Sequence, residues 1–442
     1  MIGPSGGVAG RREPDVSPMA ETLRGNAVVA QSGGPTAVIN ASACGVIQEC
    51  FRQSAIGQVY GANNGILGIL QEDLFDLRTE PAETIDGLRR TPSSAIGSCR
   101  HKLGSDAQQF ERLLDVFRAH NIRYFFYIGG NDSMDTADKI NRLAAQQGFD
   151  LRVMGVPKTV DNDLVGTDHC PGYGSVAKFL AASVMEAGRD TEAMHTFDQV
   201  TILEAMGRNT GWIAAATGLA RREEIDAPHL IYVPEVPFVI DRFLEDVRGV
   251  YRKLGRVFLV VSEGLVDENG EYITASGGKF AVDAFGHRQL GGVADVLQHL
   301  IEKEVAIKCR YNKLGTCQRN AVHFASKTDS DEAYLCGQEA VRQAAAGMTG
   351  FMVALVRESD EPYRCGTGLT KLGEVANGVK RLPREFLDES GTRITPAMRR
   401  YAGPLIRGEV PVQLAADGLP EFVRFRRQPV EHKLPEFSVK GK

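Results

Sequence analysis

The chain has 442 residues, which is too long for one small hydrophobic core, so we expect two lobes with extensions. Its 51 basic and 56 acidic residues leave a net charge of -5, which gives no electrostatic footprint for nucleic acid or for an anionic membrane. No stretch approaches the roughly 20 apolar residues of a membrane span, and residues 1–24 lack the apolar core of a signal peptide. We therefore expect a cytoplasmic protein whose partners are small molecules and further copies of the same chain.

The predicted elements alternate between strands and helices from residue 26 onward. Residues 1–24 are rich in Gly, Pro and charge and predict a disordered leader. Strands are predicted for 26–31, 124–128, 151–156 and the runs VTILEA, HLIYV and VFLVVSEG, and helices for 106–120, 133–147 and 175–188. This alternation predicts a doubly wound α/β protein with mainly parallel sheets and helices on both faces. After residue 345 the segments KRLPREF, PAMRRY and GLPEFVRF predict a helical and looped extension.

A first glycine turn, SGGPTAVIN at 32–40, joins the first strand to a predicted helix start. Gly33, Gly34 and the first helical amides could bind an oxyanion, although most such turns only satisfy backbone geometry. The turn has neither GxGxxG nor the GK[ST] ending of a P-loop, so no dinucleotide or Walker fingerprint is present. Further on, Arg100 and Lys102 lie in a loop that is either a solvated basic loop or a phosphate clamp.

Two later loops carry most of the expected chemistry. The GGNDS loop (129–133) and the PKTVDND loop (157–163) each follow a predicted strand. Both should lie at the carboxyl ends of neighbouring strands, where open α/β sheets bind ligands. Phosphoryl transfer needs their residue types: glycines for close backbone approach, carboxylates for a metal ion and a base, and a cation for developing charge. Taken alone, however, a DxD loop is more often a turn, a cap or a plain metal site than a base.

The cysteines and the tryptophan predict structural roles. The eight cysteines are scattered without CxxC spacing or a nearby histidine pattern, so we expect reduced thiols and neither a disulfide framework nor a zinc site. Trp212 is the only tryptophan, and we expect it to pack in the core rather than stack on a ligand.

Seven motifs occur in the order and spacing of a known family. They are SGGPTAVIN at 32–40, GGNDS at 129–133, PKTVDND at 157–163, EAMGRNTGW at 204–212, VPE at 233–235, SEG at 262–264 and GHRQLGG at 286–292. In these motifs the chain resembles the phosphofructokinases over about 26–340, and the later run LGEVAN is similar to the long bacterial members. Within the family it is most similar to the pyrophosphate-dependent 6-phosphofructokinases, which make fructose 1,6-bisphosphate from fructose 6-phosphate.

The resemblance implies two similar doubly wound lobes. The phosphoryl donor would bind the lobe at 25–170 and fructose 6-phosphate the lobe at 171–288, while 289–442 returns across both lobes and ends in an extension. The implied reaction is reversible transfer from magnesium pyrophosphate to the 1-hydroxyl of fructose 6-phosphate, in both the glycolytic and the gluconeogenic direction. A homodimer or homotetramer is also implied, because the family usually completes its sugar-phosphate site across a subunit interface.

Asp132 decides the expected donor. ATP-using relatives commonly have glycine at this fourth position of the loop, which leaves room for a nucleotide α-phosphate. The Asp132 carboxylate would fill that space and repel an α-phosphate at close range. Lys158 replaces a glycine of many ATP enzymes and would contact both the transferred group and the leaving phosphate, although some ATP-using relatives share this lysine.

By resemblance Asp161 is the general base that takes the proton of the sugar 1-hydroxyl, and Asp132, Lys158 and Thr159 complete the catalytic set. The implied cofactor is Mg2+. Asn131 stands where relatives often have aspartate, and its amide offers a carbonyl oxygen but no charge. The implied metal-binding residues are Asn131, Asp132 and Asp163.

The remaining implied residues bind the two substrates. The donor-binding residues are Gly33, Gly34, Arg100, Gly130 and Ser133. The substrate-binding residues are Thr159, Val160, Asp161, Met206, Gly207, Arg208, Glu235, His287, Thr316 and Arg319. Capping a helix is the alternative role for Glu235. Leu290 replaces an arginine, and Thr316 a tyrosine, of relatives, which shifts the expected cation for the 6-phosphate towards Arg319.

Three other functions stay open at this stage. An ATP-dependent phosphofructokinase is the nearest, and Asp132 counts against it. A sugar-phosphate-binding regulatory subunit without catalysis is the second, and Asn131 points to it. The presence of Asp161, Lys158 and Arg208 counts against it. A nucleotide-dependent dehydrogenase is the third, and the missing GxGxxG makes it remote. The acceptor is open too, since nothing excludes sedoheptulose 7-phosphate.

Overall fold

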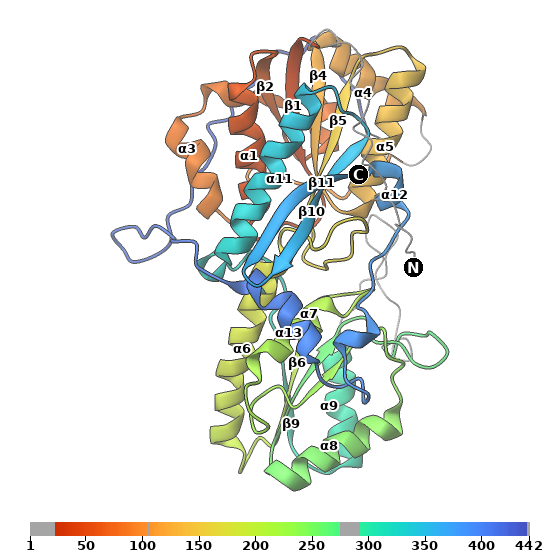
Figure 1. Ribbon diagram of the computed structural model, residues 1–442, viewed down its shortest axis with the longest axis vertical. Coiled ribbons are helices and arrows are strands. Elements are labelled where there is room, and N and C mark those ends of the chain that lie inside the picture. The colour runs from red at the N-terminus through yellow and green to blue at the C-terminus, as the bar shows by residue number, and fades with distance from the viewer. Residues whose placement is uncertain (1–22, 104–106, 275–291, 440–442) are drawn as a thin grey trace, which may run out of the picture.

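The protein folds into two lobes that are stacked along its long axis (Figure 1). The structure is a computed structural model, and it describes residues 23–103, 107–274 and 292–439. The leader predicted for 1–24 therefore lies outside the described residues except for its last two, and so do His287 and Leu290.

The first lobe is built on a seven-stranded sheet with the order β11-β10-β5-β4-β1-β2-β3. Its strands are β1 (Gly25–Gln31), β2 (Ile56–Ala62), β3 (Leu74–Asp76), β4 (Ile122–Gly129), β5 (Arg152–Pro157), β10 (Phe351–Asp360) and β11 (Tyr363–Lys371). β5, β4, β1 and β2 run parallel, whereas β3 and β11 join antiparallel at the two edges. The central strands are apolar along their length because helices cover both faces of the sheet.

One edge of this sheet is a hairpin that the sequence did not predict. β10 pairs parallel with β5 and antiparallel with β11, from Phe351 opposite Lys371 to Asp360 opposite Tyr363. The sequence analysis named no element for 351–371, so the hairpin was missed rather than predicted otherwise. Glycines within β11 weaken its local strand signal, and pairing with a strand far back in the chain supplies the missing order.

The second lobe has a smaller sheet with the order β7-β8-β6-β9. Its strands are β6 (Val200–Ala205), β7 (Leu230–Tyr232), β8 (Val257–Ser262) and β9 (Cys309–Lys313). All the pairings between them are parallel. The strands predicted from VTILEA, HLIYV and VFLVVSEG are confirmed, and they are neighbours in space.

Helices cover both faces of each sheet, as a doubly wound fold requires. The first lobe has α1 (Ile39–Arg52), α2 (Ile66–Leu70), α3 (Ala82–Gly87), α4 (Ala107–Ala119), α5 (Asn131–Gln146), α11 (Lys327–Ala345) and α12 (Leu372–Ala376). The second has α6 (Tyr173–Met194), α7 (Trp212–Ala216), α8 (Ile240–Leu254), α9 (Val293–Glu304), α10 (Cys317–Asn320) and α13 (Pro396–Ala402). Buried apolar clusters lie on both faces of the first sheet and on both faces of the second. The predicted fold class is confirmed.

The C-terminal part of the chain returns to the first lobe. α11 packs against α1 so closely that a Cβ on Gly45 would lie 2.1 Å from the Tyr334 carbonyl oxygen. Beyond α13 the extension continues along the first lobe, where the buried Glu72 carboxylate accepts the backbone N–H groups of Lys433 and Leu434. The part of the expected extension that lies beyond α13 is thus held against the first lobe.

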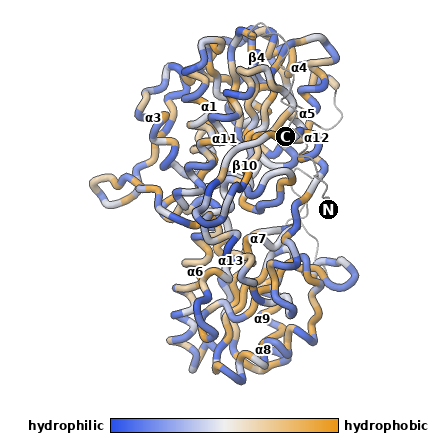
Figure 2. The backbone as a smooth tube through the Cα atoms, in the orientation of Figure 1, coloured by the Kyte–Doolittle hydropathy of each residue, from blue (hydrophilic) through white to orange (hydrophobic). Residues whose placement is uncertain are grey.

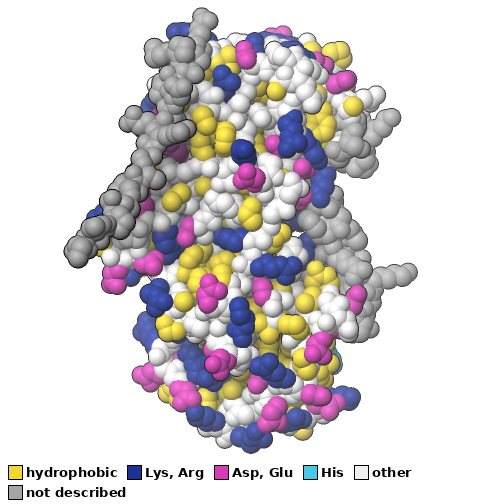
Figure 3. All heavy atoms as spheres, turned by 45° about the vertical axis from the view of Figure 1, so that its right-hand side comes forward, with side chains coloured by type: hydrophobic (Ala, Val, Ile, Leu, Met, Phe, Trp, Pro, Cys, Tyr) yellow, Lys and Arg dark blue, Asp and Glu magenta, His cyan; other side chains and the backbone are white. Residues whose placement is uncertain are grey.

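Polar and apolar residues are interspersed along both lobes (Figure 2). None of the helices in the described ranges is both long and apolar enough to span a membrane. Basic and acidic side chains are mixed over the face drawn in Figure 3, in keeping with the small net charge.

Candidate active site

A cavity of about 360 Å3 lies where loops of the two lobes face each other. Its walls come from the loops after β1, β4 and β5 of the first lobe and from those after β6 and β8 of the second. The carboxyl ends of parallel strands are the usual ligand-binding edge of an open α/β sheet. The lining residues are Ser32, Gly33, Gly34, Arg100, Gly130, Asn131, Asp132, Ser133, Lys158, Thr159, Val160, Asp161, Asp163, Met206, Arg208, Asn209, Glu263, Arg319 and Val379.

The GGNDS loop turns directly from β4 into α5. A Cβ on Gly129 would lie 2.1 Å from Ser133 Oγ, so this turn has no room for a larger residue. Asn131, Asp132 and Ser133 consequently form the first turn of α5 and line the cavity. The free N–H groups and the positive dipole end of a helix favour an anion at this position.

Asp132 points to the basic loop that was recognised in the sequence. Its Oδ1 lies 3.1 Å from Lys102 Nζ, and both side chains are partly exposed. Arg100 of the same loop lines the cavity. The structure therefore brings this loop to the ligand-binding edge, which favours the phosphate clamp over an unrelated solvated loop.

The two glycines after β1 lie beneath cationic side chains. Gly33 has φ of 76°, and a Cβ there would lie 3.1 Å from Lys158 Nζ. A Cβ on Gly34 would lie 2.8 Å from an Arg319 guanidinium nitrogen and 3.9 Å from one of Arg100. A larger residue would crowd these cations, and the result is a positively charged floor suited to phosphate. α1 begins at Ile39 rather than directly after the glycines, so its first amides do not adjoin Gly33 and Gly34 in the chain.

The PKTVDND loop places a lysine and two carboxylates in the cavity. Burial lowers the pKa of Lys158 to about 8, because the ammonium is removed from water. Burial raises the pKa of Asp161, against the opposing attraction of Lys158 and Arg208. Burial together with repulsion from Asp161 raises the pKa of Asp163 to about 7. Two crowded carboxylates of this kind are suited to share a metal ion or to exchange a proton.

Asn131 and Asp163 meet across the two loops. Asn131 Nδ2 donates a hydrogen bond to Asp163 Oδ2 at 3.4 Å. The Asn131 Oδ1 atom is buried and has no hydrogen-bond partner among the described residues. A buried carbonyl oxygen without a partner beside a carboxylate is the donor set that a hard cation such as Mg2+ prefers.

The acceptor side is formed by two adjoining loops of the second lobe. Gly207 has φ of 125°, and its N–H group donates to Glu263 Oε1 at 3.3 Å. A Cβ on Gly264 would lie 1.8 Å from the Arg208 carbonyl oxygen, so the loops after β6 and β8 touch. This contact sets Arg208 and Glu263 side by side in the cavity wall. Burial and the nearby Asp161 raise the pKa of Glu263 to about 7.

A family model described as Phosphofructokinase matches residues 26–344 of the chain. The chain belongs to the phosphofructokinase family. A protein from Halomonas elongata named "Pyrophosphate--fructose 6-phosphate 1-phosphotransferase" is 48% identical over 421 residues, which are 94% of this chain and 99% of that protein. A protein of the same name from Xanthomonas campestris pv. campestris is 47% identical over 418 residues, again 94% and 99% of the two chains. The crystal structure of a pyrophosphate-dependent phosphofructokinase from Marinobacter aquaeolei has 44% identity, a TM-score of 0.85, and coverage of 94% of this chain and 100% of that chain.

These matches confirm the resemblance to the phosphofructokinases that the seven motifs indicated. Most of the residues implied by it line the one cavity. Glu235, Thr316 and Gly207 do not, and His287 lies outside the described residues. Both Glu235 carboxylate oxygens accept the Gly211 N–H group at the start of α7, and one also accepts the Leu382 N–H group. Glu235 therefore has the contacts of its alternative role as a helix cap, and Thr316 is exposed at the start of α10.

Glu263 is the functional candidate that the sequence analysis missed. It belongs to the SEG motif, which contributed to the phosphofructokinase resemblance without being given a role. The available signal was an acidic residue directly after β8, the strand paired with β6, at whose end Arg208 lies. Glu235 in the VPE motif and Glu263 in the SEG motif both follow strands. Only their contacts in the structure show which of the two lines the cavity.

The prediction for Trp212 is confirmed. Trp212 is buried against the rings of Tyr173, Phe386 and Tyr401. All eight cysteines are free thiols.

A second polar group lies away from the cavity, at His169, Glu332 and Cys365, whose ligand atoms all lie within 4.8 Å of one another. His169 Nε2 is 2.6 Å from Glu332 Oε2, which is the separation of a hydrogen bond. We therefore interpret these side chains as a hydrogen-bonded network rather than as the ligands of a metal ion.

Proposed function

We propose that this member of the phosphofructokinase family transfers a phosphoryl group reversibly from magnesium pyrophosphate to the 1-hydroxyl of fructose 6-phosphate. One observation carries the proposal: Lys158, Asp161 and Asp163 of the first lobe line the same cavity as Arg208 and Glu263 of the second. Relatives that match almost the whole chain and are named for this reaction support it.

Asp161 acts as the general base. Its raised pKa brings a carboxylate closer to the pH at which it can accept the proton of the attacking hydroxyl. The backbone N–H group of Asp161 donates to Thr159 Oγ1 at 3.1 Å, so Thr159 fixes the turn that carries the base. Lys158 stabilises the charge that develops on the transferred group, with Arg100 and the amides of the GGNDS loop on the donor side.

Asp163 and Asn131 would hold Mg2+, with Asp132 next to them. The partnerless Asn131 oxygen and the raised pKa of Asp163 are the observations that fit a cation here. When bound, Mg2+ neutralises charge on the donor oxygens. The loss of one negative ligand through Asn131 is offset by the adjacent Asp163 carboxylate.

Pyrophosphate is the donor because of Asp132. Its carboxylate lies at the first turn of α5, where it is paired with Lys102 and lines the cavity. A nucleotide would have to bring its α-phosphate past this negative charge. Pyrophosphate ends at its second phosphorus and has no such group to place.

Glu263 and Arg208 bind the sugar, and Arg319 binds phosphate from the wall between the two sides. The Glu263 carboxylate can accept sugar hydroxyls, whereas the Arg208 guanidinium can donate to sugar or phosphate oxygens. We also propose that the chain acts in the cytoplasm as a homodimer or homotetramer, with a second copy adding cations for the 6-phosphate. Sedimentation velocity with and without fructose 6-phosphate tests the assembly.

The test of the function is the formation of fructose 1,6-bisphosphate by the purified chain with fructose 6-phosphate and Mg2+. Pyrophosphate and ATP are compared as donors, and Asp161→Asn is run beside the wild type. We expect turnover with pyrophosphate only, and its loss in the variant. Turnover with ATP would refute the argument from Asp132, and substrate binding without turnover would establish a regulatory subunit.

A further inference from the structure

Asn162 lies between the two carboxylates of the PKTVDND loop. Its side chain forms hydrogen bonds to residues outside this loop. It is fully buried and has φ of 55°. Asn162 Oδ1 accepts from Cys170 N at 2.9 Å and from Lys380 Nζ at 3.3 Å, and Nδ2 donates to the Tyr401 hydroxyl at 2.9 Å. Asn adopts left-handed backbone more readily than most residues with a side chain, and these bonds hold it in that conformation.

Lys380 makes several further hydrogen bonds to the residues around this loop. Its ammonium also donates to Asp168 O at 2.7 Å and to Thr167 O at 3.3 Å. Its own backbone N–H group donates to Asp163 O at 2.8 Å. Within the described ranges no carboxylate lies at ion-pair distance from this ammonium, so a partly buried charge is bound only by amide and carbonyl oxygens.

The same residue contacts the acceptor side. The Lys380 carbonyl oxygen accepts the indole N–H group of Trp212 at 2.9 Å, and its ammonium lies 5.2 Å from the centre of the Trp212 ring. Trp212 begins α7 directly after the loop that carries Arg208. Leu382, next but one in the chain, donates to the Glu235 carboxylate that caps this helix. The segment 380–382 therefore bonds to loops of both lobes.

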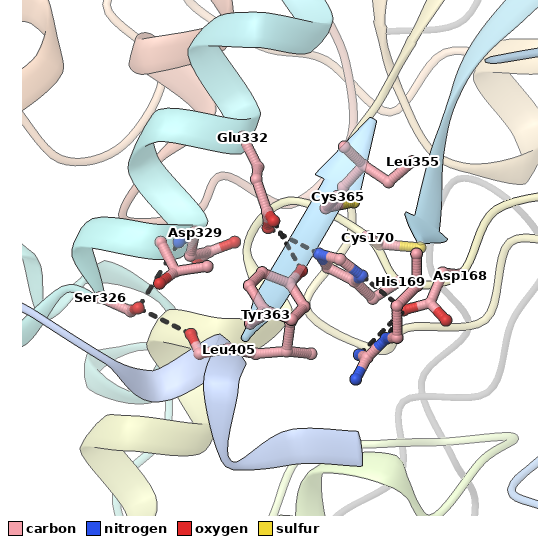
Figure 4. A network of polar contacts seen from close by, with 12 residues as sticks. Asp168, His169, Cys170, Ser326, Asp329, Glu332, Leu355, Tyr363, Cys365 and Leu405 are labelled. Atoms are coloured by element: carbon pink, nitrogen blue, oxygen red, sulfur yellow. Dashed lines mark hydrogen bonds and ion pairs between the residues drawn. The ribbon is translucent and has the colours of Figure 1, made fainter. Parts of the chain in front are cut away.

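Asp168, whose carbonyl oxygen accepts the Lys380 ammonium, is held by the hydrogen-bonded group around His169, away from the cavity (Figure 4). His169 lies between two carboxylates, with Nδ1 2.8 Å from Asp168 Oδ1 and Nε2 2.6 Å from Glu332 Oε2. Tyr363 of the hairpin donates to the other Glu332 oxygen at 2.6 Å. The Tyr401 hydroxyl donates to the Asp168 carbonyl oxygen at 2.8 Å. The carbonyl oxygens that accept hydrogen bonds from Lys380 and Tyr401 thus belong to a segment, 167–169, that is itself held in place.

We propose that Lys380, with Tyr401 as its partner, is a positioning residue that holds the PKTVDND loop in register with the sugar-binding loop of the second lobe. Lys380 does not line the cavity, so it contacts neither the transferred phosphoryl group nor the attacking hydroxyl. Its effect passes through Asn162 and the Asp163 backbone to the flanking carboxylates, and through Trp212 to α7. This inference rests on the proposed function, because the loop is taken to carry the base and the metal-binding carboxylate.

The cost of this arrangement argues for a role beyond general stability. Removing an ammonium from water without a carboxylate at ion-pair distance is unfavourable, and burial lowers the pKa of Lys380 against the opposing attraction of Asp168 and Asp163. An apolar residue of similar length would fill the space at a lower desolvation cost. What the lysine adds is a set of directed bonds to the oxygens of one loop.

The test is a double-variant cycle with Lys380→Met and Tyr401→Phe, in the full chain. The turnover number with pyrophosphate is measured per folded site, with sites counted from the stoichiometry of fructose 6-phosphate binding by calorimetry. We expect kcat to fall about 10- to 100-fold in Lys380→Met, since small misplacements of reacting groups cost this much. We expect a smaller fall in Tyr401→Phe, and a double variant that is less impaired than the product of the two effects.

Lys371→Met is the matched control, because it removes an exposed lysine from the same C-terminal segment. A residue that only stabilises the fold would lower the melting temperature and leave kcat per folded site unchanged, and that result would overturn the proposal. Multiplying effects in the double variant would overturn it as well. If Lys380→Met does not fold, Tyr401→Phe decides, since the phenyl ring still fills the site. A wild type without pyrophosphate turnover refutes the proposed function, not the positioning role alone.

Discussion

The donor side and the acceptor side of the cavity are built in different ways. On the donor side, short runs of consecutive residues follow β1, β4 and β5, which are neighbours in one parallel sheet. On the acceptor side, Arg208 and Glu263 follow β6 and β8, but Arg319 comes from α10 and Val379 from the C-terminal segment. Apart from Arg100, which comes from the loop before α4, the donor side therefore follows from the sheet itself, whereas the acceptor side depends on contacts between distant segments.

This difference separates chemistry from recognition. The cations and carboxylates that act on phosphorus lie on the rigid edge of the larger sheet, where adjacent strand ends fix their spacing. The sugar is recognised by groups whose positions depend on loop packing. Changes on the donor side should therefore reduce kcat, and changes on the acceptor side should raise KM for fructose 6-phosphate.

Asp161→Asn should give the largest effect. The amide keeps the shape of the carboxylate but accepts no proton, so kcat should fall about 10^2- to 10^4-fold. Initial rates with pyrophosphate measure the loss, and calorimetry should find fructose 6-phosphate binding retained. A fall of less than about tenfold would remove Asp161 from the role of base.

Glu263→Gln and Glu235→Gln form a matched pair on the acceptor side. Losing the charge at Glu263, which lines the cavity, should raise KM for fructose 6-phosphate about tenfold or more, as expected for a hydrogen bond to a charged group. Glu235→Gln should leave KM nearly unchanged and lower the melting temperature, because this carboxylate binds backbone N–H groups at 3.0 Å. The opposite pattern in steady-state kinetics would restore Glu235 as the sugar-binding acid.

Asp132→Gly should change donor preference. Removing the carboxylate opens space and removes repulsion, so the ratio of kcat/KM for ATP to that for pyrophosphate should rise about tenfold, equal to about 1.4 kcal/mol. Asp132→Asn keeps the volume and removes the charge, and it separates the two causes. An unchanged ratio in both variants would show that Asp132 does not select the donor.

His229 acts on stability rather than on catalysis. Its Nδ1 accepts the Phe258 N–H group at 2.7 Å within the second lobe, and burial lowers its pKa from 6.5 to about 4. The unfolded chain therefore binds a proton first, so this contribution is complete above pH 6.5 and is lost as pH falls towards 4. Between pH 7 and 5 the wild type should lose about 2 kcal/mol more than His229→Asn, measured by urea unfolding. Exposed His299→Asn is the control and should behave as wild type.

Much of the donor side could be predicted from the sequence, because apolar runs followed by glycine and acidic residues mark strand ends. Asn131, Lys158 and Asp161 were found in this way. The choice between Glu235 and Glu263 could not be made, since both acids follow strands and only tertiary contacts show which one lines the cavity.

Two further features carry no local signal. The hairpin of β10 and β11 gains its order from pairing with β5, which lies far back in the chain. Lys380 lies in a segment without a motif, and its bonds to Asn162 and Trp212 exist only after the C-terminal part has returned across both lobes. Sequence patterns report what neighbouring residues do, and these features depend on residues that are neighbours only in space.

The reverse reaction tests the central claim, pyrophosphate as the donor, most directly. The purified chain is given fructose 1,6-bisphosphate and Mg2+ with either inorganic phosphate or ADP, and fructose 6-phosphate is measured. We predict that fructose 6-phosphate forms with phosphate, together with an equal amount of pyrophosphate, and that none forms with ADP. Formation with ADP alone would contradict the account, because the donor site would then accept a nucleotide despite Asp132.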